Sequence, residues 1–270
     1  MTQKFDGVQD TLFIPLTARI KVSKQFPEFF YDEKALSLET KLPSVNSKSE
    51  FFHMAIASRY FCIDKIVRKF CSQYDSCNII CLGAGLETMA WRIDTNAHFY
   101  EVDFEEVIKT REAVLQQKEN ESFICSDILD LSWISNIDKK TPALFVATGV
   151  FQYIKESEVL SLIDGLKREF DSAEIVFDAT NTMGLKIAQK MVERSGNKGA
   201  PMYFAVDNPI DFCSKAHIEL IECRGVYKEA LQMLAKKLTF VSKISMWVAE
   251  ILGNVKIIHA RLTGGKNEGK

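Results

Sequence analysis

A short apolar run that leads directly into two glycines is the feature that most constrains this chain. Residues 78–82 read Asn-Ile-Ile-Cys-Leu, and Gly83, Ala84, Gly85 and a potential helix follow at once. Glycine has no Cβ, so such a loop turns tightly and its backbone approaches a ligand closely. The pattern predicts the first strand, nucleotide loop and first helix of a doubly wound α/β domain.

The residues around this loop favour a nucleoside ligand without a pyrophosphate. Thr88 stands where the pyrophosphate-binding pattern G-x-G-x-x-G has its third glycine. Eighteen positions beyond Gly85, the strand-like run 98–102 ends on Asp103, and a carboxylate at this place faces the ribose hydroxyls. Because a glycine pair alone also makes ordinary turns, the prediction depends on the loop and Asp103 together.

Strand-like and helix-like runs alternate beyond this loop, which predicts a parallel sheet. The strand-like runs cover 78–82, 98–102, 122–125, 143–147, 174–178, 217–222 and 255–262. A helix is expected at about 49–70, where Ser47 and Glu50 have capping-box spacing, and a helical stretch at 228–252. Asp103 and Glu106 form a second cap pair.

The 270 residues, 47% of them hydrophobic, suffice for one elaborated domain with a substantial core. We expect a helical N-terminal lid over 1–75 and a nucleotide-binding domain over 76–263. Helical insertions are expected near 181–213 and 227–252, and a disordered tail over 264–270.

Charge and cysteine content exclude several classes of function. The net charge is −2 and both signs are interleaved, so there is no basic footprint for nucleic acid and no polybasic membrane patch. The seven cysteines form no C-x-x-C pair and the four histidines have no metal-ligand spacing. No basic segment followed by an apolar one begins the sequence. We therefore expect a cytoplasmic protein with reduced cysteines and no metal site.

Ligands of open parallel sheets bind at the carboxyl ends of the strands. Ser126, Asp127 and Ile128 follow the third predicted strand, so Asp127 could accept from an adenine amino group while Ile128 contacts the ring. Alternatively, Asp127 or Asp130 caps the turn before Trp133.

In combination, these motifs resemble the leucine carboxyl methyltransferase superfamily, including its bacterial polyketide O-methyltransferase branch. The resemblance covers about 51–262 and rests on G-A-G-L-E-T with Trp91-Arg92, the run 100–103, and 126–128 with Trp133 downstream. It implies a Rossmann-like class I fold with a seven-stranded mixed sheet in the order 3-2-1-4-5-7-6 and a helical N-terminal cover. It also implies S-adenosylmethionine as cofactor and S-adenosylhomocysteine as product.

The resemblance also implies a set of cofactor-binding residues. By its motif, Arg59 corresponds to the arginine that holds the methionine carboxylate; apart from the resemblance, a solvated helix arginine is the simpler interpretation. The family commonly has Glu before Gly after the fourth strand, whereas this chain has Thr148. The implied set is Arg59, Gly83, Ala84, Gly85, Asp103, Phe104, Ser126, Asp127, Ile128 and Thr148.

The expected activity is an O-methyltransferase with a small-molecule acceptor. The alternatives are a carboxyl methyltransferase for a protein C-terminus and a silent module that binds the cofactor without turnover. A hydroxyl acceptor needs a base, for which Tyr153, Asp178 and His53 are the candidates. An apolar acceptor chamber could be lined by Phe51, Phe52, Met202, Tyr203, Phe204 and Met246, although core packing is equally compatible with these residues. The sequence predicts no oligomeric state.

Overall fold

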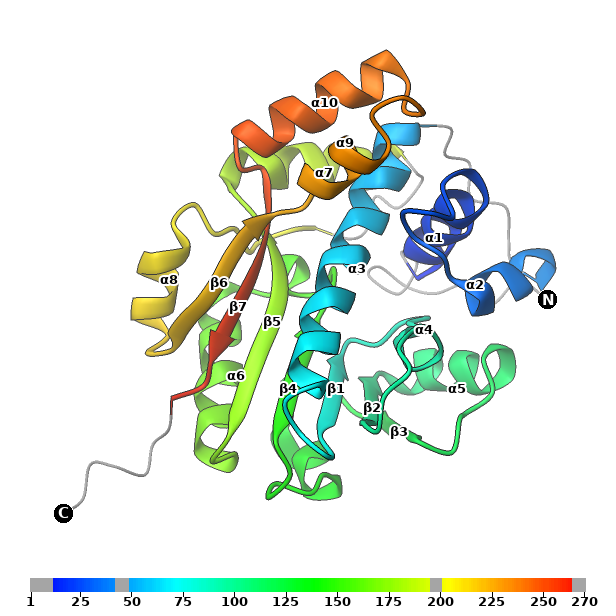
Figure 1. The fold of residues 1–270 in the computed structure, drawn as a ribbon. Coiled ribbons are helices and arrows are strands. Elements are labelled where there is room, and N and C mark those ends of the chain that lie inside the picture. Colours follow the sequence, from blue (N-terminus) through cyan, green and yellow to red (C-terminus); the bar gives the residue numbers. More distant parts are fainter. Residues whose placement is uncertain (1–11, 42–48, 195–200, 264–270) are drawn as a thin grey trace.

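Seven strands form one mixed sheet in the order β3-β2-β1-β4-β5-β7-β6 (Figure 1). This computed structural model describes residues 12–41, 49–194 and 201–263. The strands are β1 (Asn78–Leu82), β2 (His98–Asp103), β3 (Glu121–Cys125), β4 (Ala143–Ala147), β5 (Ala173–Thr180), β6 (Glu219–Gly225) and β7 (Val255–Arg261). β1 to β5 pair in parallel, whereas β7 lies antiparallel between β5 and β6. The predicted fold class and strand order are therefore confirmed.

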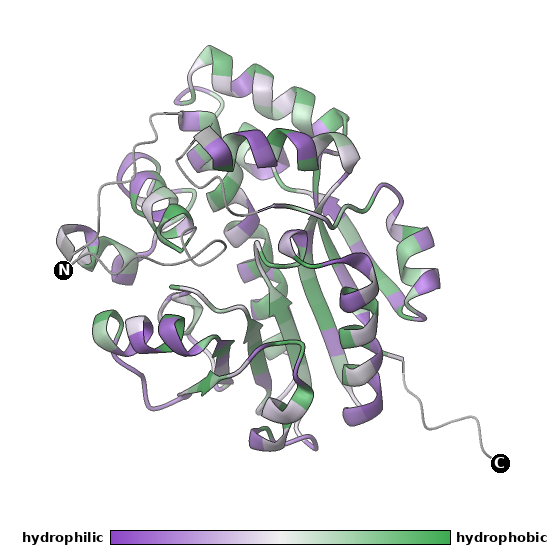
Figure 2. Cartoon of the chain, turned by 180° about the vertical axis from the view of Figure 1, so that it is seen from behind, coloured by the Kyte–Doolittle hydropathy of each residue, from purple (hydrophilic) through white to green (hydrophobic). Residues whose placement is uncertain are grey.

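Helices cover both faces of this sheet (Figure 1). Every residue of β1, β4 and β5 is buried, as expected for central strands covered on both faces, and Figure 2 shows these strands as largely hydrophobic. The helices are α1 (Phe13–Gln25), α2 (Glu33–Ser37), α3 (Glu50–Cys71), α4 (Met89–Arg92), α5 (Glu105–Val114), α6 (Glu156–Glu169), α7 (Thr182–Arg194), α8 (Pro209–Lys215), α9 (Lys228–Met233) and α10 (Phe240–Ile251). Short 3₁₀ turns are η2 (Glu39–Lys41), η3 (Leu131–Asn136) and η4 (Phe151–Tyr153).

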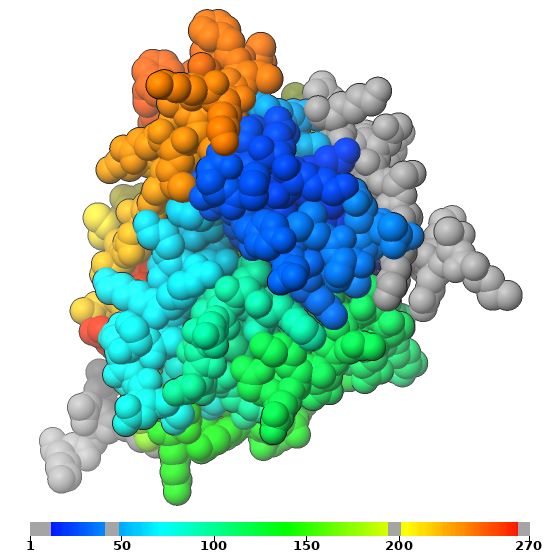
Figure 3. Space-filling view, turned by 45° about the vertical axis from the view of Figure 1, so that its right-hand side comes forward, coloured from blue at the N-terminus to red at the C-terminus, as the bar shows by residue number. Residues whose placement is uncertain are grey.

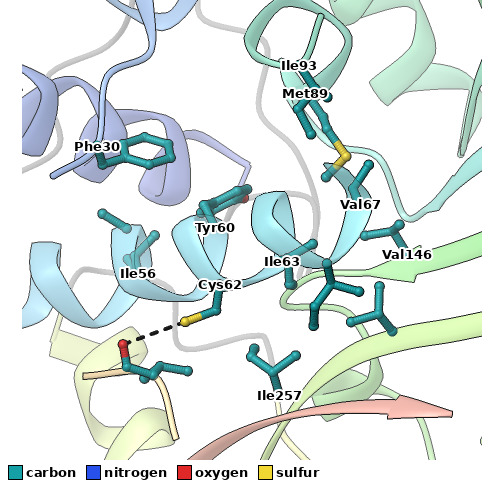
Figure 4. Close-up of a cluster of buried hydrophobic side chains, with 14 of the residues drawn as sticks. Phe30, Ile56, Tyr60, Cys62, Ile63, Val67, Met89, Ile93, Val146 and Ile257 are labelled. Carbon is teal, nitrogen blue, oxygen red and sulfur yellow. Dashed lines mark hydrogen bonds between the residues drawn. The ribbon is translucent and has the colours of Figure 1, made fainter. Parts of the chain in front are cut away.

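The long helix α3 packs against the sheet on one side and against the N-terminal helices on the other. Figure 4 shows Ile63 and Val67 on the side of Val146, while Tyr60 lies on the side of Phe30. Residues 12–41 form a separate layer: in Figure 3 the blue α1 and α2 lie between the orange α9 and α10 and the teal and green segments of the nucleotide half. The expected N-terminal cover thus consists of a core helix and an outer pair.

Several local predictions were wrong. Ser49, not Ser47, caps α3, because its side chain accepts from the N–H of Phe52 at 3.3 Å; Ser47 lies outside the described residues. Phe104 occupies the N-cap position of α5, so Asp103 and Glu106 are not a cap pair.

The C-terminal half differs from the sequence prediction in two places. The helical stretch 228–252 is two helices, α9 and α10. His217 has a positive φ of 51° and precedes β6 instead of opening it. The tail 264–270 lies outside the described part of the chain.

Candidate functional site

A cavity of about 290 Å³ opens at the carboxyl ends of β1, β2, β3 and β4. This is where an open parallel sheet binds its ligand. Arg59 apart, every residue of the predicted cofactor set lines it: Gly83, Ala84, Gly85, Asp103, Phe104, Ser126, Asp127, Ile128 and Thr148. The structure therefore gathers in one place residues that span 66 positions of the sequence, from 83 to 148.

The loop after β1 can be built only with glycine at its turning points. Gly83 and Gly85 have φ values of 63° and 52°, which other residues adopt only with strain. A Cβ on Gly83 would lie 2.7 Å from Cγ2 of Val150. Arg111 stabilises the loop, because its Nη1 donates hydrogen bonds to the carbonyls of Gly85 and Glu87, each at 3.0 Å.

Asp103 connects this loop to the end of β2. One carboxylate oxygen accepts from the N–H of Gly85 at 2.7 Å and the other from the N–H of Phe104 at 2.8 Å. Burial raises the pKa of Asp103, and the two backbone N–H groups partly oppose this shift. An ionised carboxylate has about four lone-pair positions, so Asp103 keeps acceptor capacity for hydroxyl groups of a ligand.

Thr148 supplies an unused polar group at the wall of the cavity. Its Oγ1 is buried and makes no hydrogen bond within the described part of the chain. Buried polar groups are nearly always paired in folded proteins. The cavity therefore fits a ligand that brings a polar atom to Thr148, and this hydroxyl occupies the place for which the family pattern has a carboxylate.

The loop after β3 contains both a residue that lines the cavity and a residue that caps the turn before Trp133, the two roles between which the sequence did not decide. Asp127 lines the cavity, and its Oδ1 also accepts from the N–H of Leu129 at 2.9 Å. Asp130 caps the turn η3 by accepting from the N–H of Ser132 at 3.1 Å. The turn before Trp133 is thus capped by Asp130, which leaves Asp127 at the cavity.

Arg59 lies on the far side of the loop after β4. Its Nη1 is 2.5 Å from Oδ2 of Asp178, and Oδ1 of Asp178 accepts from the N–H of Gly149 at 2.5 Å. Burial lowers the pKa of Arg59, but the attraction of Asp178 outweighs it, so the pKa lies above its usual value. Arg59 is therefore not a solvated helix arginine, and it lines a second cavity.

This second cavity, of about 420 Å³, adjoins the first. Pro15, Gly149 and Tyr153 line both. Helices α3, α7 and α10 enclose the second cavity, and its lining is mostly apolar. Phe51, Phe52 and Met202 lie there as predicted.

Three other residues predicted for such a chamber do not line it. Tyr203 is exposed, Met246 is buried in the core between α10 and α3, and Phe204 packs in an aromatic cluster with Phe177 and Phe212. Their apolar character indicated burial but not the direction of the side chain.

The three candidate bases have different surroundings. Tyr153 lines both cavities, whereas Asp178 lines neither and is paired with Arg59. His53 is buried on α3 beside Phe52 and lines neither cavity. Geometry thus leaves Tyr153 as the candidate that an acceptor could contact and argues against His53.

A buried network that ties the N-terminal helices to the nucleotide loop was missed by the sequence analysis. Arg19 of α1 donates to the carbonyl of Leu86 at 2.5 Å and to Oγ1 of Thr88 at 2.5 Å. Thr88 in turn donates to Asp32 at 2.6 Å. Arg92 binds Glu87 at 2.6 Å. Thr88, which departs from the dinucleotide pattern, is therefore an anchor for α1 and α2.

The described part of the chain contains neither a membrane-spanning helix nor a cluster suited to a metal ion. No helix there is long and apolar enough to cross a bilayer. No cluster of three or more His, Cys, Asp or Glu side chains suited to a metal ion occurs within 12–41, 49–194 and 201–263.

Comparison with known proteins identifies the relatives of this chain. The family description "leucine carboxyl methyltransferase" matches residues 18–167. The tetracenomycin polyketide synthesis O-methyltransferase TcmP of Streptomyces glaucescens is 24% identical over 213 residues, which are 77% of this chain and 78% of that protein. The resemblance inferred from the motifs is thereby confirmed.

Solved structures agree on the fold. A DUF574 family protein from Streptomyces avermitilis aligns with a TM-score of 0.57 at 11% identity, over 91% of this chain and 96% of that one. A geranyl diphosphate methyltransferase in complex with GPP and sinefungin aligns with a TM-score of 0.52 at 8% identity, over 94% and 99% of the two chains.

Proposed function

The chain belongs to the leucine carboxyl methyltransferase family, and we propose that it transfers a methyl group from S-adenosylmethionine to an oxygen of a small molecule. One observation carries this proposal: a nucleoside-sized cavity and an apolar cavity meet at Pro15, Gly149 and Tyr153. Two reactants held in adjoining cavities can react without a separate encounter. TcmP, an O-methyltransferase, supports oxygen as the acceptor atom.

The first cavity fits the cofactor. Asp103 has acceptor capacity for a ribose diol, Asp127 and Ile128 line the cavity and would contact the adenine ring, and Thr148 has an unused hydroxyl. Arg59, which lines the second cavity next to the shared Gly149, would hold the methionine carboxylate. When bound, S-adenosylmethionine supplies a methyl carbon activated by its positive sulfur.

The residues of the chain then have to position the acceptor and exclude water. The apolar walls from α3, α7 and α10 would contact an apolar acceptor and displace water from around it. A carboxylate acceptor needs no base. For a hydroxyl acceptor, Tyr153 is the residue with an ionisable oxygen at the junction, and its phenolate form would take the proton.

Methyl-labelled S-adenosylmethionine tests the proposal. The purified chain is incubated with the label and a cell extract, and the product is identified. Label is expected on a small molecule: loss in mild alkali would mark an ester, and retention would mark an aryl ether. Label on a protein band would reject the small-molecule acceptor in favour of a protein carboxyl methyltransferase. Cofactor binding without any transfer would indicate a silent module.

A further inference from the structure

The outward side of α10 carries an apolar surface that the core does not use. At 100° per residue its large exposed apolar side chains fall within one arc of about 140°. A surface helix normally turns such an arc toward the core, but here Ser242, Met246 and Ala249 form the buried side. The exposed set, hereafter the α10 face, is Phe240, Val241, Ile244, Trp247, Val248, Ile251 and Leu252.

The α10 face is continuous with the second cavity. Ile244 and Val248 belong to the α10 face and also line the cavity. Ile187 of α7 is likewise both exposed and part of the lining. α7 and α10 lie side by side at the top of Figure 2, and the side chain of Asn181, which precedes α7, donates to the carbonyl of Leu252 at 3.0 Å. An apolar path therefore runs from the cavity out along these two helices.

The two ends of this path differ in polarity. The inner end has Tyr153, which lines both cavities, and Oγ1 of Thr180, which is buried and makes no hydrogen bond within the described residues. The outer end is hydrocarbon; the charged side chains of α10 are Lys243 and Glu250, and Glu250 accepts from the N–H of Tyr227 at 2.9 Å. A matching ligand has oxygen at one end and an apolar body at the other.

We propose that the methyl acceptor is an amphiphile longer than the second cavity. Its oxygen lies beside Tyr153 and Thr180, and its hydrocarbon body leaves between α7 and α10 and lies on the α10 face. This inference rests on the proposed function and specifies its substrate class. The acceptor is favoured over a second copy of the chain as the occupant, because Ile187, Ile244 and Val248 make the surface an extension of the cavity itself.

Two series of probes of increasing length test this assignment: 4-alkylphenols and n-alkanoates of two to twelve carbons, below their micelle concentrations. Binding to the chain loaded with S-adenosylhomocysteine is measured by calorimetry. In at least one series the affinity should rise about two- to fourfold per methylene, since a buried methylene contributes up to ~0.8 kcal/mol. The long members should also shift the emission of Trp247, which is exposed on the α10 face.

Two variants distinguish binding to the α10 face from nonspecific hydrophobic binding to the protein surface. In the double variant Phe240→Ser with Ile251→Ser, the affinity should no longer rise with chain length among the long probes. The affinity for short probes should be unchanged, because neither residue lines the cavity. Ile210→Ser on α8, 69% exposed, is the matched control and should change nothing.

Three outcomes would overturn the inference: affinity independent of length, no binding of either series, or the same flattening in the control. Loss of self-association in the α10 variant, with a flat series, would assign the face to a second copy instead. Because S-adenosylhomocysteine binding is measured first, its absence would count against the proposed function, whereas its presence with a flat series would count against this inference alone.

Discussion

Arg59 and Asp178 form a partly buried ion pair, 2.5 Å between Nη1 and Oδ2, beside Gly149, which lines both cavities. Asp178 also accepts from the N–H of Gly149, so the pair connects α3 to the loop after β4. A guanidinium has five N–H donors, and Arg59 can therefore keep Asp178 while it binds a second carboxylate.

We predict that Arg59→Ala weakens binding of S-adenosylhomocysteine by about 1.5–3 kcal/mol, the usual cost of losing a hydrogen bond to a charged group. Calorimetry measures this, with folding checked by circular dichroism. Lys69→Ala, an exposed residue of the same helix, is the control and should bind normally. Binding at the wild-type affinity would remove Arg59 from the cofactor site.

The same pair yields a prediction for stability. Arg59→Ala should lower the free energy of unfolding by about 3–5 kcal/mol, because it leaves the carboxylate of Asp178 buried without its charge partner. Arg59→Ala combined with Asp178→Ala should be less destabilised than the sum of the single variants. Urea unfolding of the four proteins measures the coupling. Strict additivity would show that the pair contributes no interaction energy.

Asp103→Asn should weaken binding of S-adenosylhomocysteine by about 1.5–3 kcal/mol, because an amide nitrogen, which donates, replaces one of the two carboxylate oxygens that accept from a backbone N–H and have capacity for a ribose hydroxyl. Asp130→Asn is the matched control, since Asp130 caps η3 and does not line the cavity. It should bind normally in the same titration. Equal losses in the two variants would mean that Asp103 acts only through the fold.

The strand boundaries were predicted to within three residues, whereas the charged network was not predicted. Apolar runs such as 78–82 and 143–147 indicate strands that are buried on both faces of the sheet. The partners of Arg19 lie 13 to 69 positions away, and no local period encodes such a distance. The sequence predicted a helical stretch at 228–252 but not that the widest apolar side of α10 faces outward. Arg111 gave no sequence signal at all.

Discrimination against NAD should follow from the residues at the start of α4. The N–H of Thr88 donates to the carboxylate of Glu87 at 2.6 Å, and Arg92 binds the same carboxylate. The backbone donor that a pyrophosphate would need is therefore already used, beside a negative charge. In calorimetry, S-adenosylhomocysteine should bind and NAD should not, while adenosine should bind weakly. Comparable affinity for NAD would contradict the assignment of the cavity.

The pH dependence of stability should contain a contribution from Glu101, which is fully buried on β2. Burial raises its pKa from the ordinary 4.5 to about 7, although Nη2 of Arg111 lies 3.5 Å away and opposes the shift; Glu87 and Glu121 reinforce it. Because the folded pKa exceeds the unfolded one, the native state retains a proton that the unfolded chain releases. The stabilisation is complete below pH 4.5 and is lost as the pH rises through 7.

The loss amounts to about 3 kcal/mol at 1.36 kcal/mol per pKa unit. Glu101→Gln keeps the shape of the side chain and cannot ionise, so its stability should not show this decline. Urea unfolding at pH 5 and pH 8 compares the two proteins. Glu105→Gln on the exposed surface of α5 is the control and should follow the wild type. If wild type and Glu101→Gln lost equal stability between these pH values, the carboxyl of Glu101 would have to be charged in the folded protein, held by Arg111.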